Sequence, residues 1–475
     1  MNIEELTIEK VLDGYRNKKF SITEIIQVYF ERIKKYNPQI NSFITLCEEE
    51  ALQEAKRKDE LLKNEGVSLP LFGIPMGLKD LFSTKDIKTT ASSEVLEDYT
   101  PPYDSTVVQR LKDAGAIILG KLNCDAWAHG SSGENSDFGP TKNPWNKEYV
   151  PGGSSSGSAA SVAASFVLAA TGTDTGGSIR LPASFTNTVG LKPTYGRVSR
   201  YGVIAMASSL DSIGHFTKTV RDNALILNIT AGNDMFDATT SQNPVPNYLE
   251  NLNKGIKGLK IGIPKEYTTK EKGMELDVLL TFENAIKKLN KLGAEIIEIS
   301  LPHTEYSIAC YYIIQPSEVS SNLARYDGIR FGNDRSYFGD EAKRRIMLGT
   351  YTLSAGYYDA YYKKAMQART LIKQNFDKVF DASNGVDAII APVSPTLPWK
   401  LGEKVNDPLK MYLSDVFTVT ANLAGIPGLS VPAGFAKELP VGIQILGPHF
   451  SEELLFRIGF AFEQETEFYK SNPKL

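Results

Sequence analysis

Residues 151–183 read PGGSSSGSAASVAASFVLAATGTDTGGSIRLPA, and the interpretation of the whole chain depends on this segment. Small-residue turns at 152–158 and 173–178 flank an alanine-rich stretch. A flexible linker would also be rich in glycine and serine. A linker, however, has no need of two such turns around an apolar stretch, and Ala159–Ala170 predicts a tightly packed buried helix. We therefore interpret the segment as ordered.

The spacing of these glycines does not fit several known glycine-rich sites. A phosphate-binding P-loop requires lysine after its last glycine, and Ser158 follows Gly157 here. Neither turn supplies the GxGxxG pattern of dinucleotide-binding folds. The GxSxG pattern of lipase-type serine enzymes is absent around both Ser154 and Ser178.

The same segment meets the needs of acyl transfer, which are a nucleophile, a base and fixed donors for an oxyanion. Ser178 is the candidate nucleophile. Successive backbone N–H groups of Thr175, Gly176 and Gly177 precede it, and they can form a tight nest that serves as an oxyanion hole.

The base is more difficult to assign from sequence. His129, His215, His303 and His449 are the only histidines, and we interpret each as a hydrogen-bonded structural residue. A Ser-His-Asp triad stays possible, since its members can be distant in sequence. Lys79 ends the apolar, glycine-flanked stretch 72–79, and burial there would lower its pKa and make it a base.

The rest of the chain alternates helical and strand-like segments, which predicts the α/β class. A capping box, Ser21 to Glu24, begins a predicted helix that ends near Pro38. Other predicted helices cover 48–64, 106–115, 275–292, 341–381 with an interruption at 356–358, and 452–465. Predicted strands cover 72–79, 116–122, 259–263, 294–299, 388–391, 429–431 and 441–446. We expect one continuous domain over residues 1–475, with its core at about 60–215.

Composition indicates a soluble protein of the cytoplasm. The 475 residues carry a net charge of −4, so there is no global electrostatic case for binding nucleic acid. Cys47, Cys124 and Cys310 are widely spaced without a CxxC pair, which argues against disulfides and a zinc site. No secretory signal and no run of 18 apolar residues is present, so we expect no membrane association.

Residues 152–183, from GGSSSGSAASVA to ATGTDTGGSIRLPA, closely resemble the signature of the amidase signature family. The resemblance implies a Ser-cisSer-Lys triad, in which Ser178 is acylated, Ser154 follows a cis peptide and bridges, and Lys79 is the base. It also implies the amidase signature fold, a mixed central β-sheet between layers of α-helices.

Segments outside the signature are similar to the glutaminase subunits of tRNA-dependent amidotransferases; they are 320–328, 344–351, 356–364, 407–415 and 439–444. This resemblance implies hydrolysis of glutamine and two partner subunits, B and C, in a heterotrimer. ATP, Mg²⁺ and most contacts to the misacylated tRNA would belong to the partners, and this chain would need no cofactor. By position, Arg345 would bind the α-carboxylate of glutamine and Asp415 its ammonium, with Tyr311 close by.

One departure from the family pattern lies near the predicted pocket. Residues 125–130 read DAWAHG where the family usually has DEFAMG, so Trp127 and His129 alter one wall.

Two other functions fit the sequence. The first is a stand-alone amidase that acts on small amides with the same triad and without partners. The second is a catalytically inactive scaffold protein, against which the presence of Lys79, Ser154 and Ser178 argues.

Overall fold

The computed structural model describes residues 2–268, 273–330 and 332–475. Its strands are β1 (Phe43–Leu46), β2 (Pro75–Lys79), β3 (Ile117–Leu122), β4 (Ala169–Asp174), β5 (Val189–Lys192), β6 (Ser212–Thr217), β7 (Lys260–Pro264), β8 (Glu295–Ile299), β9 (Ala388–Pro392), β10 (Gly428–Ala436) and β11 (Leu439–Leu446). They form one 11-stranded sheet in the order β1-β3-β2-β4-β6-β5-β10-β11-β9-β7-β8.

The sheet is mixed, as the family resemblance predicts. Strands β3, β2 and β4 run parallel to one another, and so do β9, β7 and β8. The strands between these groups pair antiparallel, from β4–β6 through β5–β10 to β11–β9. The pairing of β5 with β10 joins segments that are far apart in sequence: Lys192 lies opposite Gly428.

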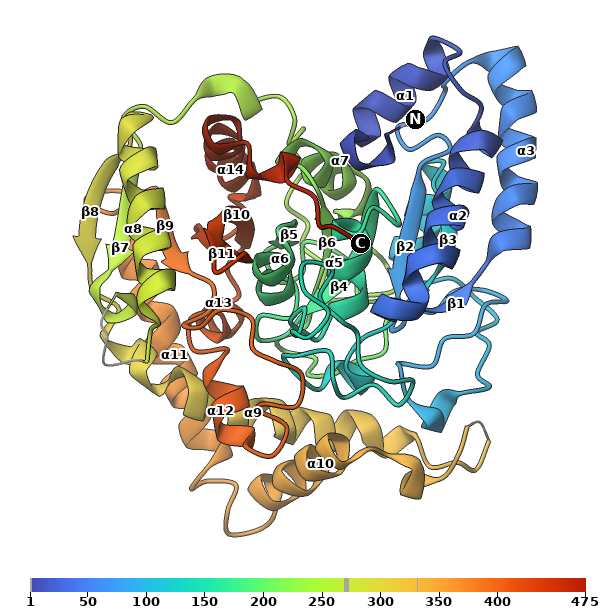
Figure 1. Cartoon of the computed structure of the whole chain (residues 1–475). Coiled ribbons are helices and arrows are strands. Elements are labelled where there is room, and N and C mark those ends of the chain that lie inside the picture. The colour runs from blue at the N-terminus through green and yellow to red at the C-terminus, as the bar shows by residue number, and fades with distance from the viewer. Residues whose placement is uncertain (1, 269–272, 331) are drawn as a thin grey trace.

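Helices pack against both faces of this sheet (Figure 1). The α-helices of the described residues are α1 (Ile8–Arg16), α2 (Ile22–Ile40), α3 (Glu48–Glu65), α4 (Thr106–Asp113), α5 (Ser156–Ala163), α6 (Arg180–Thr186), α7 (Val220–Thr230), α8 (Leu276–Lys291), α9 (Ser307–Asn322), α10 (Asp340–Leu353), α11 (Tyr362–Val379), α12 (Pro408–Leu413), α13 (Val419–Ala424) and α14 (Glu452–Thr466), and of these α10 packs mainly on α9.

Strand β10 illustrates how the two layers are built. Leu429 and Val431 lie against Gly459 of α14, whereas Gly428 lies against the Arg180 side chain of α6. Alternate residues of a strand point to opposite faces, so α6 and α14 cover opposite sides of β10. The α/β fold class and the expected mixed sheet between layers of helices are confirmed.

Most predicted elements are found with small shifts at their ends. The capping box at Ser21 and Glu24 is present, and α2 continues through Pro38 to Ile40. The interrupted helix predicted at 341–381 is the pair α10 and α11. Lys79 is the last residue of β2, as the sequence predicts.

The prediction of a single helix over Ala159–Ala170 is wrong in its second half. Helix α5 ends at Ala163, and Ser165 has a left-handed backbone conformation, with φ of 56°. The chain then enters β4, which hydrogen bonds to β2 on one side and β6 on the other. Alanine has the highest helix propensity, but such propensities amount to less than about 1 kcal/mol per residue, and pairing with the neighbouring strands overrides them.

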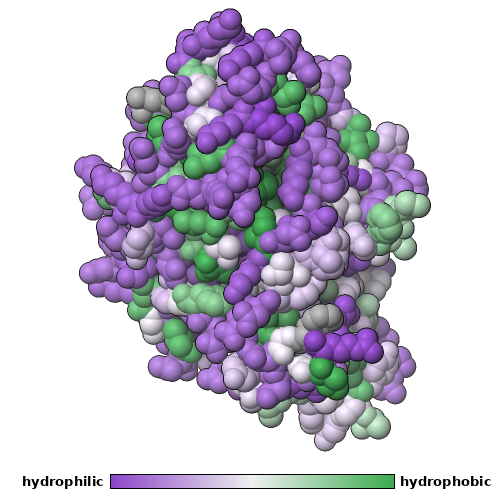
Figure 2. Space-filling view, turned by 90° about the vertical axis from the view of Figure 1, so that its right-hand side faces the viewer, coloured by the Kyte–Doolittle hydropathy of each residue, from purple (hydrophilic) through white to green (hydrophobic). Residues whose placement is uncertain are grey.

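No helix in the described ranges is long and apolar enough to cross a membrane. Figure 2 shows one face of the molecule, where hydrophilic side chains dominate and hydrophobic ones form small patches between them.

Candidate active site

Lys79 is buried at the end of β2, between β3 and β4. Its Nζ lies 2.8 Å from Ser154 Oγ, 3.0 Å from Ser155 Oγ and 2.8 Å from Thr173 Oγ1. Burial lowers the pKa of Lys79 to about 8, since the charged ammonium is poorly solvated there. A lysine with this pKa can accept a proton near neutral pH.

Ser154 lies just before α5, and the Gly153–Ser154 peptide bond is cis, as the family resemblance implies. Its carbonyl accepts a hydrogen bond from the backbone N–H of Asp125 at 3.1 Å. The next N–H, of Ser155, donates to the carbonyl of Ser178 at 3.2 Å. The segments that carry the two candidate serines are therefore adjacent.

Ser178 is 8% exposed. Among the described residues, no hydrogen bond joins its hydroxyl to Ser154, whose Oγ contacts Lys79. The contact between Ser178 and Ser154 that the predicted relay needs is therefore not among the hydrogen bonds of the described residues.

The turn between β4 and α6 is held by a buried ion pair. Asp174 accepts hydrogen bonds from the backbone N–H of Gly177 at 2.9 Å and from Arg180 Nη2 at 3.0 Å. Burial alone would raise the pKa of Asp174, but the Arg180 guanidinium outweighs this effect and the pKa falls to about 2. These residues stabilise the turn that carries Ser178.

The backbone N–H groups predicted to form the oxyanion hole differ in whether they are free to bind an oxyanion. The Gly177 N–H is already bonded to Asp174. The N–H groups of Thr175, Gly176 and Ser178 have no backbone acceptor in the described part of the chain. Thr418 Oγ1 donates to the carbonyl of Gly176 at 2.6 Å and so fixes the orientation of this peptide.

The three residues predicted to bind glutamine belong to one cluster around Tyr312. The hydroxyl of Tyr312 donates to Asp415 at 3.0 Å, and the Arg345 guanidinium lies 5.5 Å from the centre of its ring. Tyr311 packs edge-on against Tyr312, and its hydroxyl reaches Gly176, where an added Cβ would lie 2.7 Å from it. The cluster therefore extends from Arg345 to the turn before Ser178.

The two charged members of the cluster are both buried. Ser131 Oγ also donates to Asp415, at 2.8 Å, and burial raises the pKa of Asp415 to about 6. Arg345 donates from Nε to Glu341 at 2.8 Å and from Nη1 to Gln315 Oε1 at 3.0 Å. Its remaining N–H groups are available to a ligand.

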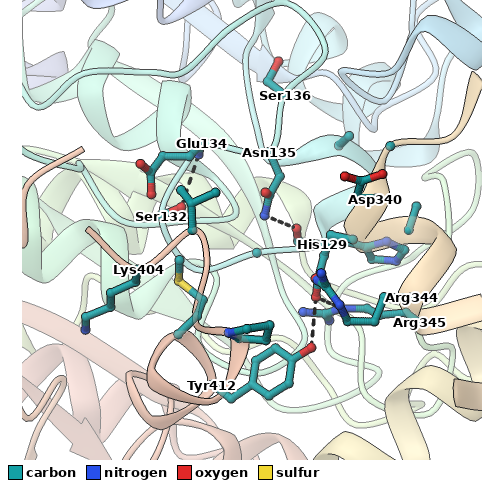
Figure 3. Close-up of a pocket in the computed structure, with 18 of the residues that line it drawn as sticks. His129, Ser132, Glu134, Asn135, Ser136, Asp340, Arg344, Arg345, Lys404 and Tyr412 are labelled. Atoms are coloured by element: carbon teal, nitrogen blue, oxygen red, sulfur yellow. Dashed lines mark hydrogen bonds and ion pairs between the residues drawn. The ribbon is translucent and has the colours of Figure 1, made fainter. Parts of the chain in front are cut away.

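A pocket of about 460 Å³ opens beside Arg345 (Figure 3). Its wall also includes His129, Asn135, Glu341 and Tyr412. Ser178, Tyr311 and Asp415 are not among its lining residues, and Arg345 is the member of the cluster around Tyr312 that lines it.

The histidines of the described chain differ in their surroundings. His215 Nε2 is 3.1 Å from Thr230 Oγ1, while its Nδ1 has no partner in the described structure, and His303 Nδ1 is 3.0 Å from Asn375 Nδ2; both histidines are thus hydrogen-bonded, as the sequence predicts. For His129 that interpretation is wrong, because neither ring nitrogen has a hydrogen-bond partner. No described histidine hydrogen bonds to Ser154 or Ser178, whereas Lys79 contacts Ser154.

Sequence reasoning missed Ser131, Ser155, Thr173 and Tyr312. Ser155 and Thr173 lie inside the segment 151–183, and their hydroxyls contact Lys79. The abundance of hydroxyl side chains in this segment was the signal that could have identified them. Ser131 and Tyr312 belong to no sequence motif that would mark them as site residues.

The profile of the amidase family matches residues 24–456. The chain belongs to the amidase family. This amidase is 51% identical to the A subunit of the glutamyl-tRNA(Gln) amidotransferase of Carboxydothermus hydrogenoformans, over 100% of both chains. The crystal structure of the corresponding protein from Thermotoga maritima, which bears the same name, matches with a TM-score of 0.84 at 43% identity, over 100% of this chain and 98% of that one.

The amidase also resembles a family member of a different kind. The peptide amidase of Stenotrophomonas maltophilia matches with a TM-score of 0.83 at 30% identity, over 98% of this chain and 97% of that one.

Proposed function

We propose that this amidase is the glutaminase component of a tRNA-dependent amidotransferase. It hydrolyses glutamine and supplies ammonia that converts Glu-tRNA(Gln) or Asp-tRNA(Asn) to Gln-tRNA(Gln) or Asn-tRNA(Asn). Identity over the full length to a glutamyl-tRNA(Gln) amidotransferase component supports the reaction. The observation that best supports the mechanism is the buried contact of 2.8 Å between Lys79 Nζ and Ser154 Oγ, because it provides one step of a proton relay.

In the proposed mechanism, Ser178 Oγ attacks the side-chain carbonyl carbon of glutamine. Its proton passes to Ser154, and the proton of Ser154 passes to the neutral amine of Lys79. The tetrahedral adduct collapses as the relay returns a proton to the leaving nitrogen, which departs as ammonia. Water then cleaves the glutamyl ester by the same relay and releases glutamate.

The oxyanion is stabilised by backbone amides of the 175–178 turn. Thr175, Gly176 and Gly177 are the donors predicted from the sequence. Because Gly177 donates to Asp174, we assign the main contribution to the amides of Thr175, Gly176 and Ser178. One such donor contributes about 3 kcal/mol in other serine enzymes.

Arg345 and Asp415 suit the two charges of free glutamine. Arg345 stays cationic and retains unused N–H groups for the α-carboxylate. Asp415 accepts a hydrogen bond from the Tyr312 hydroxyl and would pair with the α-ammonium. The Tyr311 hydroxyl lies next to Gly176, in the turn before Ser178.

We further infer that the protein works in the cytoplasm with two partner subunits, B and C. ATP and Mg²⁺ bind to a partner, which also makes most contacts to the misacylated tRNA. Exposed apolar side chains at α10 and the turn after it are consistent with a protein interface; they are Met347, Tyr351, Tyr357, Tyr358 and Tyr361.

A glutaminase assay tests the proposal, with the chain co-expressed with its partner subunits and measured with and without charged tRNA. We expect glutamine hydrolysis that Ser178→Ala reduces by at least about 1,000-fold, with an unchanged circular dichroism spectrum. Wild-type turnover by Ser178→Ala would refute the nucleophile. Hydrolysis of small amides by the isolated chain, without activity on glutamine, would instead identify a stand-alone amidase.

A further inference from the structure

His129 combines a fixed backbone with an unpaired side chain. Its N–H donates to the carbonyl of Ala126 at 2.9 Å, and its own carbonyl accepts from Asn135 Nδ2 at 2.9 Å. The side chain is 1% exposed, yet neither ring nitrogen has a partner in the described structure. Leaving a polar group buried and unpaired costs about 1–3 kcal/mol, and a hydrogen bond to a ligand would offset this cost.

The two residues before His129 have an unusual backbone conformation. Trp127 and Ala128 adopt left-handed conformations, with φ of 60° and 63°. The Trp127 ring packs between Tyr326 and Phe338, with ring centres 4.6 and 5.2 Å away. Trp127 and His129, two residues that depart from the family pattern, therefore belong to one short segment of unusual backbone conformation.

The loop that carries His129 is rigidly tied to the catalytic segment. The Asp125 carboxylate accepts hydrogen bonds from the N–H groups of Gly133 and Asn135, both at 3.0 Å. The N–H of Gly153 donates to the carbonyl of Ser131 at 2.9 Å. The loop therefore fixes the position of His129 relative to Ser154.

The charge that acts on His129 is that of Arg345, and the carboxylates of Glu134, Asp137, Asp340 and Glu341 also line the pocket. His129 lines the 460 Å³ pocket together with Arg345, and Figure 3 shows its ring on the same side as Arg344 and Arg345. Burial and the Arg345 charge both lower the pKa of His129, so the imidazole is neutral and offers one N–H donor. Asp415, the candidate partner of the ammonium, does not line this pocket.

We propose that His129 is a substrate-binding residue that donates a ring N–H to the α-carboxylate of glutamine, whose charge Arg345 neutralises. This inference rests on the proposed glutaminase function. Ser131, on the same loop, positions Asp415 for the ammonium. One loop therefore contributes to binding both the α-carboxylate and the α-ammonium of glutamine.

The test compares His129→Met and His129→Gln in the full chain co-expressed with its partners. Substrates are glutamine and 4-aminobutanamide, which is glutamine without its α-carboxylate. We expect His129→Met to raise KM for glutamine about tenfold, with kcat within about twofold, because one hydrogen bond to a charged group is lost. His129→Gln retains an N–H donor and should restore most of the affinity.

Two controls separate binding from a general structural effect. His129→Met should leave the kinetics of 4-aminobutanamide unchanged. His303→Met changes a histidine that pairs with Asn375 outside the pocket, and it should leave KM for glutamine unchanged.

An unchanged KM for glutamine in His129→Met would overturn the inference and leave the proposed function standing. An equal rise in KM for both substrates would also overturn it. Hydrolysis of 4-aminobutanamide but not of glutamine by the wild-type chain would reject the glutaminase function, and the inference with it.

Discussion

Lys79 determines how the rate should depend on pH. Its pKa is lowered to about 8 by burial, so about a tenth of the enzyme holds the neutral amine at pH 7. We expect kcat/KM for glutamine to rise about tenfold per pH unit below pH 8 and to level off above it. Steady-state kinetics between pH 6 and 9.5 measure this profile.

Lys79→Met is the control for this prediction, because it removes the amine and keeps an apolar stem. It should lose activity at every pH. A wild-type profile that is flat from pH 6 to 9 would show that an amine of this pKa is not the base.

At the scale of elements, the turn between β4 and α6 depends on the Asp174–Arg180 ion pair. Both side chains are fully buried. Removing the cation by Arg180→Leu leaves the Asp174 carboxylate buried and unpaired, so we expect a loss of about 3–5 kcal/mol in the free energy of unfolding. Denaturant-induced unfolding gives this value.

The matched control is Arg16→Leu, which breaks an ion pair with Asp13 whose side chains are 53% and 55% exposed. Exposed pairs contribute about 0–1 kcal/mol. Similar stability losses for the two variants would mean that the buried pair does not hold the turn.

At the scale of the whole molecule, the sheet connects early and late parts of the chain. Strand β10, near the C-terminus, pairs with β5, and β11 pairs with β9. We expect residues 1–475 to behave as a single domain, so limited trypsin digestion should not release two stable halves. Denaturing gels and mass spectrometry identify the fragments, and two folded fragments that separate near residues 250–275 would contradict a single domain.

The sequence by itself was enough to recognise the family and the fold class and to select Lys79, Ser154 and Ser178 as the candidate catalytic residues. These depend on local patterns, namely small-residue turns that admit close backbone contacts and an apolar strand that ends in a lysine. The capping box of α2 was predictable for the same reason, because its hydrogen bonds lie within four residues.

Only the tertiary structure decided what surrounds these residues. Thr173 contacts Lys79 because β4 pairs with β2, and the alanines of β4 form a strand for the same reason. Ser131 meets Asp415 across 284 positions of sequence. Hydrogen bonds between such distant groups form only when the sheet and its helices assemble, so no local pattern of residues encodes them.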